Sequence, residues 1–508
     1  MYSWYMGGEI LGNELIVDIG AGQNRVALLE DKELVEIYIE RPSSERMVGN
    51  IYRGKVSSVL PGMQAAFIDI GYEKNAFLYV ADIVAKKEYG DEEEDGVQDL
   101  KGYNIGELLR AGEELTVQVI KEPIGSKGPR VTTHVTLPGR HLVLLPNAEY
   151  TGVSRRIESE SERVKLKKIA EKLKPKGMGL IVRTASEGME EVDFSQDLNF
   201  LLKLWESIRN KEQSGPVPRA IHKDLSLVYR AVRDLFTLDI EKFVINDRQQ
   251  YAKVLELVDM ISPALKYRVE YFSKSYDVFE HYQLETKITR ALARKVWLKC
   301  GGYLVIDKTE ALTVIDVNTG KFVGGSNLED TVLKANIEAA REIAKQIRLR
   351  DIGGIIIIDF IDMHEHEHQQ MVLDALKQAL RKDRTKTTVV DMTGLGLIEM
   401  TRKKVRQELS TVLHTDCPYC DGTGKILSAE AVARNVEKEV GRYFGQTIAN
   451  AVQVEVHPSV AVVLKADTNG NISRLQETYG KKILFKASEE MKHEDMRIRD
   501  VDINTLVC

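Results

Sequence analysis

Cysteine is scarce in this chain of 508 residues, which contains four cysteines, too few for a disulfide framework in a protein of this size. Long apolar runs are also missing, since no stretch approaches the roughly 20 residues that span a bilayer as a helix. The first eight residues lack the charged-then-apolar layout of a secretory signal. We therefore expect a cytoplasmic protein without a membrane segment.

An excess of positive charge is missing as well. The formal net charge is −6, so the overall composition does not indicate a nucleic-acid binder. Binding to nucleic acid depends on local patches rather than on global charge. Much of the acidity lies in residues 88–99, which we interpret as a solvated surface loop, whereas basic residues cluster in 163–176, 377–386 and 402–406. Each basic cluster is either a helix face in water or a contact for phosphate.

The most informative stretch runs from residue 303 to residue 363. Residues 311–318 alternate and are rich in β-branched side chains, which predicts a strand. A long amphipathic segment from about 328 to 349 predicts a helix. The unbroken isoleucine run within 353–363 predicts a fully buried strand.

Each predicted strand carries an aspartate, Asp316 or Asp359, where a core residue would be expected. A buried carboxylate is costly unless it is paired or binds a metal. Asn318 shares a strand face with Asp316, and two strands joined by one helix can bring all three side chains to one sheet edge. Such oxygen ligands suit a divalent ion, Mg²⁺ before others. The other interpretation is that each aspartate caps a helix or pairs with an arginine.

Two runs in this stretch, LTVIDVN at 312–318 and EAAREIAKQIRLRDIGGIIIIDFIDM at 338–363, form a long, nearly ungapped motif. They resemble the catalytic region of the ribonuclease E/G family. The resemblance implies a Mg²⁺-dependent endoribonuclease of RNA processing, rRNA processing and mRNA decay that leaves 5′-phosphate and 3′-hydroxyl ends on single-stranded RNA. It also implies that Asp316 and Asp359 hold the catalytic Mg²⁺ and that Asn318 assists them.

The resemblance covers the chain from about residue 13 onward and implies a multidomain α/β and α+β fold, as the length of the chain also indicates. The implied parts are a ribonuclease-H-like subdomain in two pieces (1–48 and 221–285), an inserted OB-fold RNA-binding barrel of the S-one type (49–134), a 5′-monophosphate sensor (135–220), a deoxyribonuclease-I-like catalytic domain (286–411), a zinc link (412–427) and a small C-terminal α/β oligomerisation domain (428–508).

The predicted barrel consists of short strands with glycine turns, and such barrels stack bases on exposed aromatic rings beside a basic groove. The resemblance implies that Phe67 and Phe77 stack bases and that Lys127 meets phosphate. The alternative for both phenylalanines is the barrel core. The acidic run 88–99 falls inside this barrel as an inserted loop.

Arg183 and Thr184 follow an apolar strand, and together they could grip a terminal phosphate through a guanidinium and a hydroxyl. The resemblance implies that they form the sensor that makes a 5′-monophosphate stimulatory. The alternative for Arg183 is a surface ion pair. Further basic residues, which we place on the first helix of the catalytic domain and near its end, could line the RNA path: Arg290, Arg294, Lys295, Arg402 and Lys403.

Cys417 and Cys420 have the spacing of a zinc knuckle, but two thiolates make only half of a tetrahedral site. Cys300 and Cys508 stand alone, and His414 is a possible third ligand. The resemblance implies that the pair shares Zn²⁺ with a second subunit, giving a homodimer, with a tetramer as the larger alternative assembly. An empty thiol pair is the alternative.

Two other functions compete with an endoribonuclease. A non-catalytic RNA-binding scaffold protein would keep the fold without the chemistry, although the set Asp316, Asn318 and Asp359 argues against it. An actin-like nucleotide hydrolase is indicated only by the fragment Val17–Gly20. Within the family, we expect the chain to be closer to ribonuclease G, because it lacks a long scaffold tail.

Overall fold

The computed structural model describes residues 12–41, 46–84, 103–123, 127–157, 159–320 and 328–502. The acidic run 88–99 and Cys508 lie outside these residues. The chain divides into two compact units, Met1–Val412 and Leu413–Cys508. None of the described helices combines the length and the apolar character needed to cross a bilayer.

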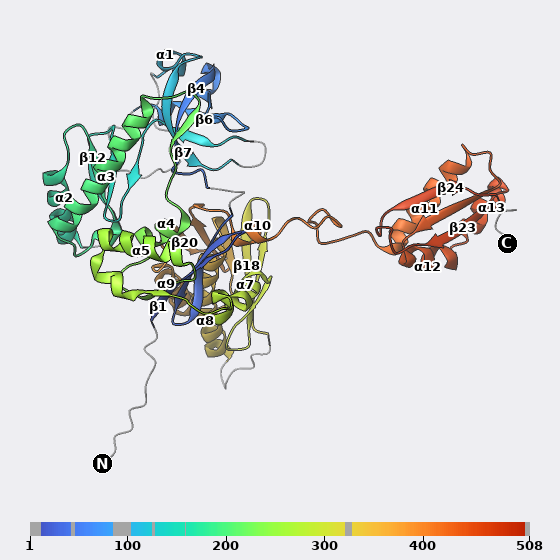
Figure 1. Ribbon diagram of the computed structural model, residues 1–508. Coiled ribbons are helices and arrows are strands. Elements are labelled where there is room, and N and C mark those ends of the chain that lie inside the picture. The colour runs from blue at the N-terminus through green and yellow to red at the C-terminus, as the bar shows by residue number, and fades with distance from the viewer. Residues whose placement is uncertain are drawn as a thin grey trace. The chain divides into compact units, whose positions relative to one another are not determined.

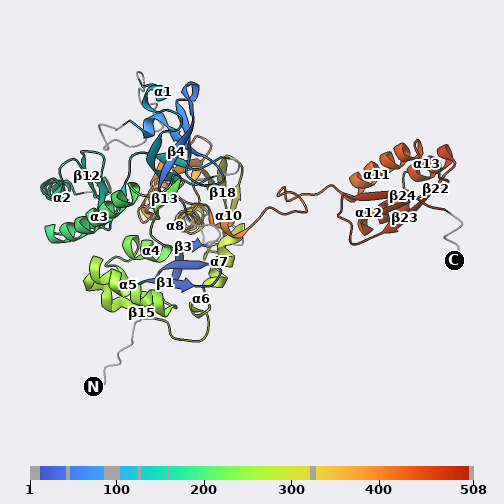
Figure 2. The same cartoon turned by 45° about the horizontal axis from the view of Figure 1, so that its top comes forward.

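One sheet of the first unit draws its strands from two distant segments (Figure 2). Its order is β15-β14-β1-β2-β3, with β1 parallel to β14 and antiparallel to β2, so β1 and β2 form an N-terminal hairpin. Helices α4 and α5 share its apolar core, which includes Phe236 and Phe243. The elements are β1 (Asn13–Ile19), β2 (Asn24–Glu30), β3 (Glu33–Glu40), α4 (Leu227–Asp234), β14 (Ile240–Ile245), α5 (Arg248–Ile261) and β15 (Val269–Tyr271).

Five strands form a closed barrel in the order β4-β5-β6-β8-β7, because β7 pairs back with β4. This arrangement is consistent with the predicted OB-fold. Alternate side chains such as Ala66, Ile68 and Leu78 fill the barrel. The elements are β4 (Ile51–Leu60), β5 (Ala65–Asp69), β6 (Ala76–Tyr79), α1 (Ile105–Leu108), β7 (Glu114–Lys121) and β8 (Arg130–Thr132), with β13 (Arg219–His222) added at the edge of β4.

A smaller sheet with the order β11-β12-β10-β9 follows the barrel in the chain. Helix α2, which carries much of the basic cluster 163–176, and the long helix α3 bury Leu166 and Phe194 in one core with this sheet. The elements are β9 (Leu137–Pro138), β10 (Leu142–Leu145), β11 (Thr151–Val153), α2 (Glu160–Leu173), β12 (Gly179–Val182) and α3 (Glu191–Glu212).

A six-stranded sheet contains the stretch that the sequence singled out, in the order β16-β17-β18-β19-β21-β20 (Figure 1). Strands β18 and β19 are parallel and joined through α8, so the predicted strand, helix and strand are confirmed. The elements are α6 (Val278–His281), α7 (Leu284–Leu292), β16 (Lys295–Trp297), β17 (Tyr303–Lys308), β18 (Leu312–Asn318), α8 (Leu328–Arg350), β19 (Gly354–Asp359), α9 (His366–Leu380), β20 (Thr387–Met392), β21 (Leu397–Arg402) and α10 (Leu409–Leu413).

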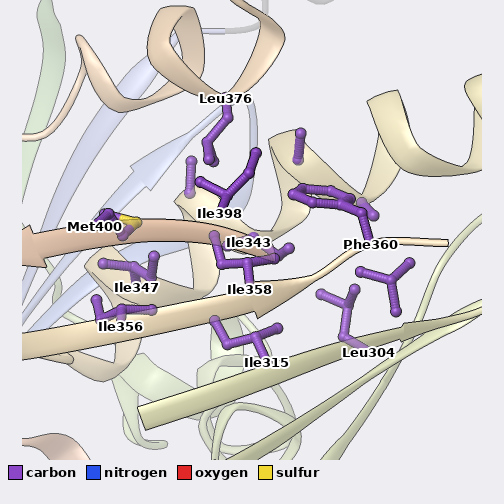
Figure 3. Packing of buried hydrophobic residues seen from close by; sticks show 14 of the residues in the cluster. Leu304, Ile315, Ile343, Ile347, Ile356, Ile358, Phe360, Leu376, Ile398 and Met400 are labelled. Atoms are coloured by element: carbon purple, nitrogen blue, oxygen red, sulfur yellow. The ribbon is translucent and has the colours of Figure 1, made fainter. Parts of the chain in front are cut away.

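The prediction that the isoleucine run is fully buried is wrong. Ile356 and Ile358 are 0% exposed, whereas Ile355 is 49% exposed. Figure 3 shows the buried isoleucines of the sheet facing α8 and α9, where they meet Ile343 and Leu376. Helices cover one face of this sheet, and the alternate side chains of β19 therefore point to a face that is largely open.

The second unit is a small α/β structure with a three-stranded sheet of order β23-β22-β24. Strand β22 is parallel to β23 and antiparallel to β24. Its mixed helices and strands agree with the small α/β fold expected for residues 428–508. The elements are α11 (Ala429–Phe444), β22 (Ala451–Val456), α12 (Pro458–Ala466), α13 (Asn471–Tyr479), β23 (Lys482–Ala487) and β24 (Met496–Asp500).

Candidate active site

Asp316 and Asp359 lie side by side at the carboxyl ends of β18 and β19. The two strands are parallel, and their register pairs Asp316 directly with Asp359. Adjacent strands are about 4.8 Å apart, so the two carboxylates come from neighbouring backbones. Their strand neighbours Ile315 and Ile358 point into the core, and both aspartates therefore lie on the open face.

Asn318 completes this group of polar side chains, because its Nδ2 donates a hydrogen bond of 2.8 Å to Oδ2 of Asp316. Partial burial, and after it the negative charges of Asp316 and Asp362, raise the pKa of the Asp359 carboxyl above its ordinary range. Among the described residues, neither Asp316 nor Asp359 forms an ion pair with a basic side chain. Negative charge thus accumulates here without a cation from the part of the chain that the structure describes.

These contacts fit a divalent cation better than the structural alternative. Neither aspartate caps a described helix or pairs with an arginine within the described residues, as a structural role would require. Within the same residues, no group of three or more His, Cys, Asp or Glu side chains is arranged as a metal cage. Two carboxylates and an amide suit an ion that keeps several waters, as Mg²⁺ does.

Sequence reasoning missed Asp362, which contributes to the charge around Asp359. Its signal was a second aspartate three residues beyond Asp359, in the segment where the strand ends. A cavity of about 1220 Å³ in this unit is lined by Arg183 but not by the paired aspartates, which are both exposed. The acidic pair therefore lies on an open surface rather than in a deep pocket, which suits a polymer more than a small molecule.

Phe67 and Phe77 are register partners on β5 and β6 of the barrel. Their ring centroids are 6.0 Å apart in an edge-to-face arrangement, and both side chains are half-buried. The barrel core instead takes their strand neighbours Ala66, Ile68, Ala76 and Leu78, so the core alternative does not hold for either ring. Lys127 is exposed and precedes Pro129, whose carbonyl accepts a hydrogen bond from the Phe77 amide.

Arg183 and Thr184 follow β12, and both already have polar partners. The Arg183 guanidinium lies 2.8 Å from the Asp234 carboxylate, and the Thr184 hydroxyl lies 2.8 Å from that of Ser154. Both residues follow the end of this strand but contact different partners, and Arg183 lines a cavity. A phosphate bound there would compete with Asp234 for Arg183.

The structure corrects the prediction that Arg402 lines the RNA path. Its side chain is 2% exposed and forms ion pairs of 2.7 Å with both Asp351 and Asp383. Arg402 shares the core face of β21 with Met400, which explains its burial. Lys295 begins β16 rather than lying on a helix, whereas Arg290, on α7, and Lys403 are exposed and remain compatible with the prediction. Arg294 also lies beyond the end of α7, and it is held in an ion pair of 2.5 Å with Asp307.

The cysteine pair lies at the beginning of the second unit. Backbone amides of Tyr419 and Cys420, together with the Cys420 thiol, lower the pKa of Cys417. The Cys420 sulfur accepts a hydrogen bond of 3.3 Å from the amide of Gly424. Amide donors favour thiolates, which are the form that binds metal, so the pair fits half of a zinc site. The described residues supply no further ligands to it.

Comparisons with known proteins show which family this chain is similar to. A model described as "Ribonuclease E/G family" matches residues 136–405, and one described as "RNase E/G, Thioredoxin-like domain" matches residues 416–501. Ribonuclease G of Escherichia coli (strain K12) is 42% identical over 470 residues, which cover 92% of this chain and 96% of that protein. Ribonuclease G of Haemophilus influenzae is 42% identical, covering 96% of this chain and 99% of that protein. Ribonuclease E of Escherichia coli (strain K12) is 38% identical, covering 85% of this chain and 41% of that protein.

Proposed function

The chain belongs to the ribonuclease E/G family of endoribonucleases, and from this premise we propose that it cuts single-stranded RNA with Mg²⁺ held by Asp316 and Asp359. The observation that carries the proposal is the direct pairing of these two aspartates across parallel strands. The pair is exposed and lacks a basic partner among the described residues, as an ion site requires. Such an ion would lower the pKa of a bound water and neutralise charge on the phosphate.

The residues of the chain have separate tasks in this reaction. Asn318 donates to one oxygen of Asp316, which fixes the carboxylate and leaves its other oxygen available for the ion. Asp359 supplies the second carboxylate from the adjacent strand. In-line attack of water with departure of the 3′-oxygen yields a 5′-phosphate and a 3′-hydroxyl.

RNA would be held at two further places. Phe67 and Phe77 present half-buried rings outside the barrel core, where bases can stack, and Lys127 is exposed for phosphate. Arg183 and Thr184 would bind a 5′-monophosphate after Arg183 exchanges Asp234 for the phosphate. This exchange would make cleavage depend on the 5′ end, as expected in mRNA decay and in rRNA processing.

Cys417 and Cys420 would hold half of a Zn²⁺ site and share the ion with the same pair of a second chain. The amide donors around both sulfurs support this proposal, because they favour the thiolate form. The resulting homodimer, with a tetramer as a further possibility, would act in the cytoplasm.

The deciding experiment compares internally cut products of one single-stranded RNA, carrying either a 5′-monophosphate or a 5′-hydroxyl. Cleavage is measured with Mg²⁺ and with EDTA, using the wild type and Asp316→Asn. The proposal predicts Mg²⁺-dependent cuts that Asp316→Asn loses and that are faster on the 5′-monophosphate. Binding without cutting in every condition would instead favour the non-catalytic RNA-binding scaffold.

A further inference from the structure

A cluster of two aromatic rings and one lysine lies on the open face of the six-stranded sheet. Trp297 of β16 pairs in register with Tyr303 of β17, and their ring centroids are 5.4 Å apart in an edge-to-face arrangement. Trp297 is 61% exposed. The Lys295 ammonium lies 3.3 Å from the Tyr303 centroid and 4.2 Å from that of Trp297. We call these three residues the aromatic platform.

The aromatic platform adjoins the paired aspartates on the same face. Tyr303 is the register partner of Asn318, and Val305 is the partner of Asp316. Tyr303 is therefore a diagonal neighbour of Asp316, at about 7–8 Å between backbones. Trp297 lies one strand further from the carboxylates, about 5 Å beyond Tyr303. The spacing is that of one or two nucleotides of a bound strand.

The turn that joins β16 to β17 fixes the platform against the acidic pair. The Leu298 amide donates to the Gly302 carbonyl at 2.8 Å, which closes the turn. Glu338 of α8 accepts a hydrogen bond of 3.2 Å from the Cys300 amide. A Cβ on Gly302 would lie 2.7 Å from the Asn318 carbonyl, so this glycine allows the turn to approach the end of β18 closely. The rings are thus held in place rather than carried on a free loop.

We propose that the aromatic platform stacks a nucleobase of the RNA substrate within two nucleotides of the scissile phosphate. The proposal rests on the endoribonuclease function above and adds a subsite to it. Trp297 offers an exposed ring, and every base has a face that can stack on it. Within the described part of the chain, Lys295 has no carboxylate at ion-pair distance. A phosphate flanking the base would draw the ammonium off the rings and leave them to the base.

The choice of RNA over a protein partner follows from charge and position. The platform adjoins two carboxylates that need a cation. Its lysine supplies positive charge beside this ion site, where the next phosphates of a bound RNA strand would lie. A protein contact would require neither the lysine nor the alignment with Asp316. Loss of oligomeric state in a platform variant is therefore an outcome that contradicts the proposal.

The test is abasic scanning of an RNA that is cut at one site. An abasic nucleotide is placed at each position around the cut, and kcat and KM are measured for the wild type, Trp297→Ala and Trp297→Phe. We expect wild-type kcat/KM to fall on the order of 10-fold at one position within two nucleotides of the cut. On intact RNA, Trp297→Ala should lower kcat/KM by a similar factor, mainly through KM. In this variant, an abasic nucleotide at the same position should lower kcat/KM no further. In Trp297→Phe, the abasic nucleotide at this position should again lower kcat/KM, because a ring is present for the base to stack on.

A matched control is Tyr267→Ala, which removes an aromatic side chain that is 76% exposed on another element of the same unit. This variant should show the wild-type abasic profile. The proposal is overturned if Trp297→Ala keeps the wild-type sensitivity at that position, or if its losses follow dissociation of the oligomer.

A second readout separates failure of the platform from failure of the proposed function. The sequence has three tryptophans, and Trp4→Phe with Trp205→Phe leaves Trp297 as the only tryptophan, whose emission is excited selectively over that of tyrosine. In an Asp316→Asn background, single-stranded RNA should quench this emission, and RNA with the abasic nucleotide at the critical position should quench it less. Quenching without any cleavage by the wild type would refute the endoribonuclease and keep the stacking site. Cleavage without quenching would refute only the platform.

Discussion

Asp316 and Asp359 are direct register partners across two parallel strands, so two exposed carboxylates lie side by side on the six-stranded sheet. Like charges at this spacing repel each other, and the raised pKa of Asp359 reflects that repulsion after the effect of partial burial. The arrangement costs stability in the absence of a cation. A bound cation would offset this repulsion between the two carboxylates.

The first prediction concerns stability without metal. Because the pKa of Asp359 is raised on folding, the folded chain holds this proton more tightly than the unfolded chain, and ionisation costs stability above that pKa. In EDTA at pH 7, Asp359→Asn should therefore be more stable than the wild type, by roughly 0.5 kcal/mol because water screens an exposed group. The advantage should disappear below about pH 4, where the wild-type carboxyl is protonated. Urea titrations at both pH values would measure it, and an advantage that persists at low pH would contradict this explanation.

The second prediction separates Arg402 from the RNA path. Its guanidinium joins Asp351 and Asp383 inside the unit, and removing it leaves the buried Asp383 without its cation and Asp351 with Arg406 alone. Arg402→Ala should lower the free energy of unfolding by about 3–5 kcal/mol. Lys403→Ala, at the exposed neighbouring position, should change it by less than about 0.5 kcal/mol. Denaturant unfolding of both variants decides the point, and equal stabilities would argue for a surface role of Arg402.

The third prediction concerns the barrel. Phe67→Ala should weaken binding of single-stranded RNA by about 1–3 kcal/mol, because a stacking ring is lost. The phenylalanine is half-buried outside the barrel core, so stability should change much less than in Ile68→Ala, which removes a core side chain. Fluorescence anisotropy with labelled RNA measures the affinity. Unchanged affinity in Phe67→Ala, with a barrel that remains folded, would remove this ring from the proposed RNA path.

The fourth prediction concerns the cysteine pair. Cys417→Ser with Cys420→Ser should abolish bound zinc and shift the assembly toward single chains, whereas Cys300→Ser, outside the knuckle, should change neither. Metal analysis and light scattering on the same samples give both quantities. A shared site requires one zinc for two chains, so one zinc bound to each chain would contradict it.

The sequence predicted the strands and the helix around Asp316 and Asp359 because their hydrophobic periodicity is strong. Prediction from the sequence was wrong where the burial of a side chain depends on which face of a strand the helices cover. Four consecutive isoleucines look alike in sequence, but helices cover only one face of β19, so Ile355 is exposed beside the buried Ile356. The prediction for Arg402 was wrong for the same reason, because its position on the core face follows from the pairing of β21 with β19.

The candidate site was predictable only where it depends on the alternation of side chains within one strand. Alternation along one strand placed Asp316 and Asn318 on one face, and their hydrogen bond agrees with that placement. The register of neighbouring strands is set by tertiary packing. No local pattern could therefore show that Trp297 and Tyr303 lie next to this pair.

The most direct test of the central claim asks whether the two aspartates act as one ion site. Single-turnover cleavage at saturating RNA is measured against Mg²⁺ concentration for Asp316→Asn, Asp359→Asn and the double variant, with binding of the same RNA as the control. If one ion needs both carboxylates, each single variant should lose at least about a thousandfold in rate, and the double variant should be no slower than either. RNA binding should stay close to that of the wild type. A near-normal cleavage rate in either single variant, or losses that multiply in the double variant, would contradict a shared ion.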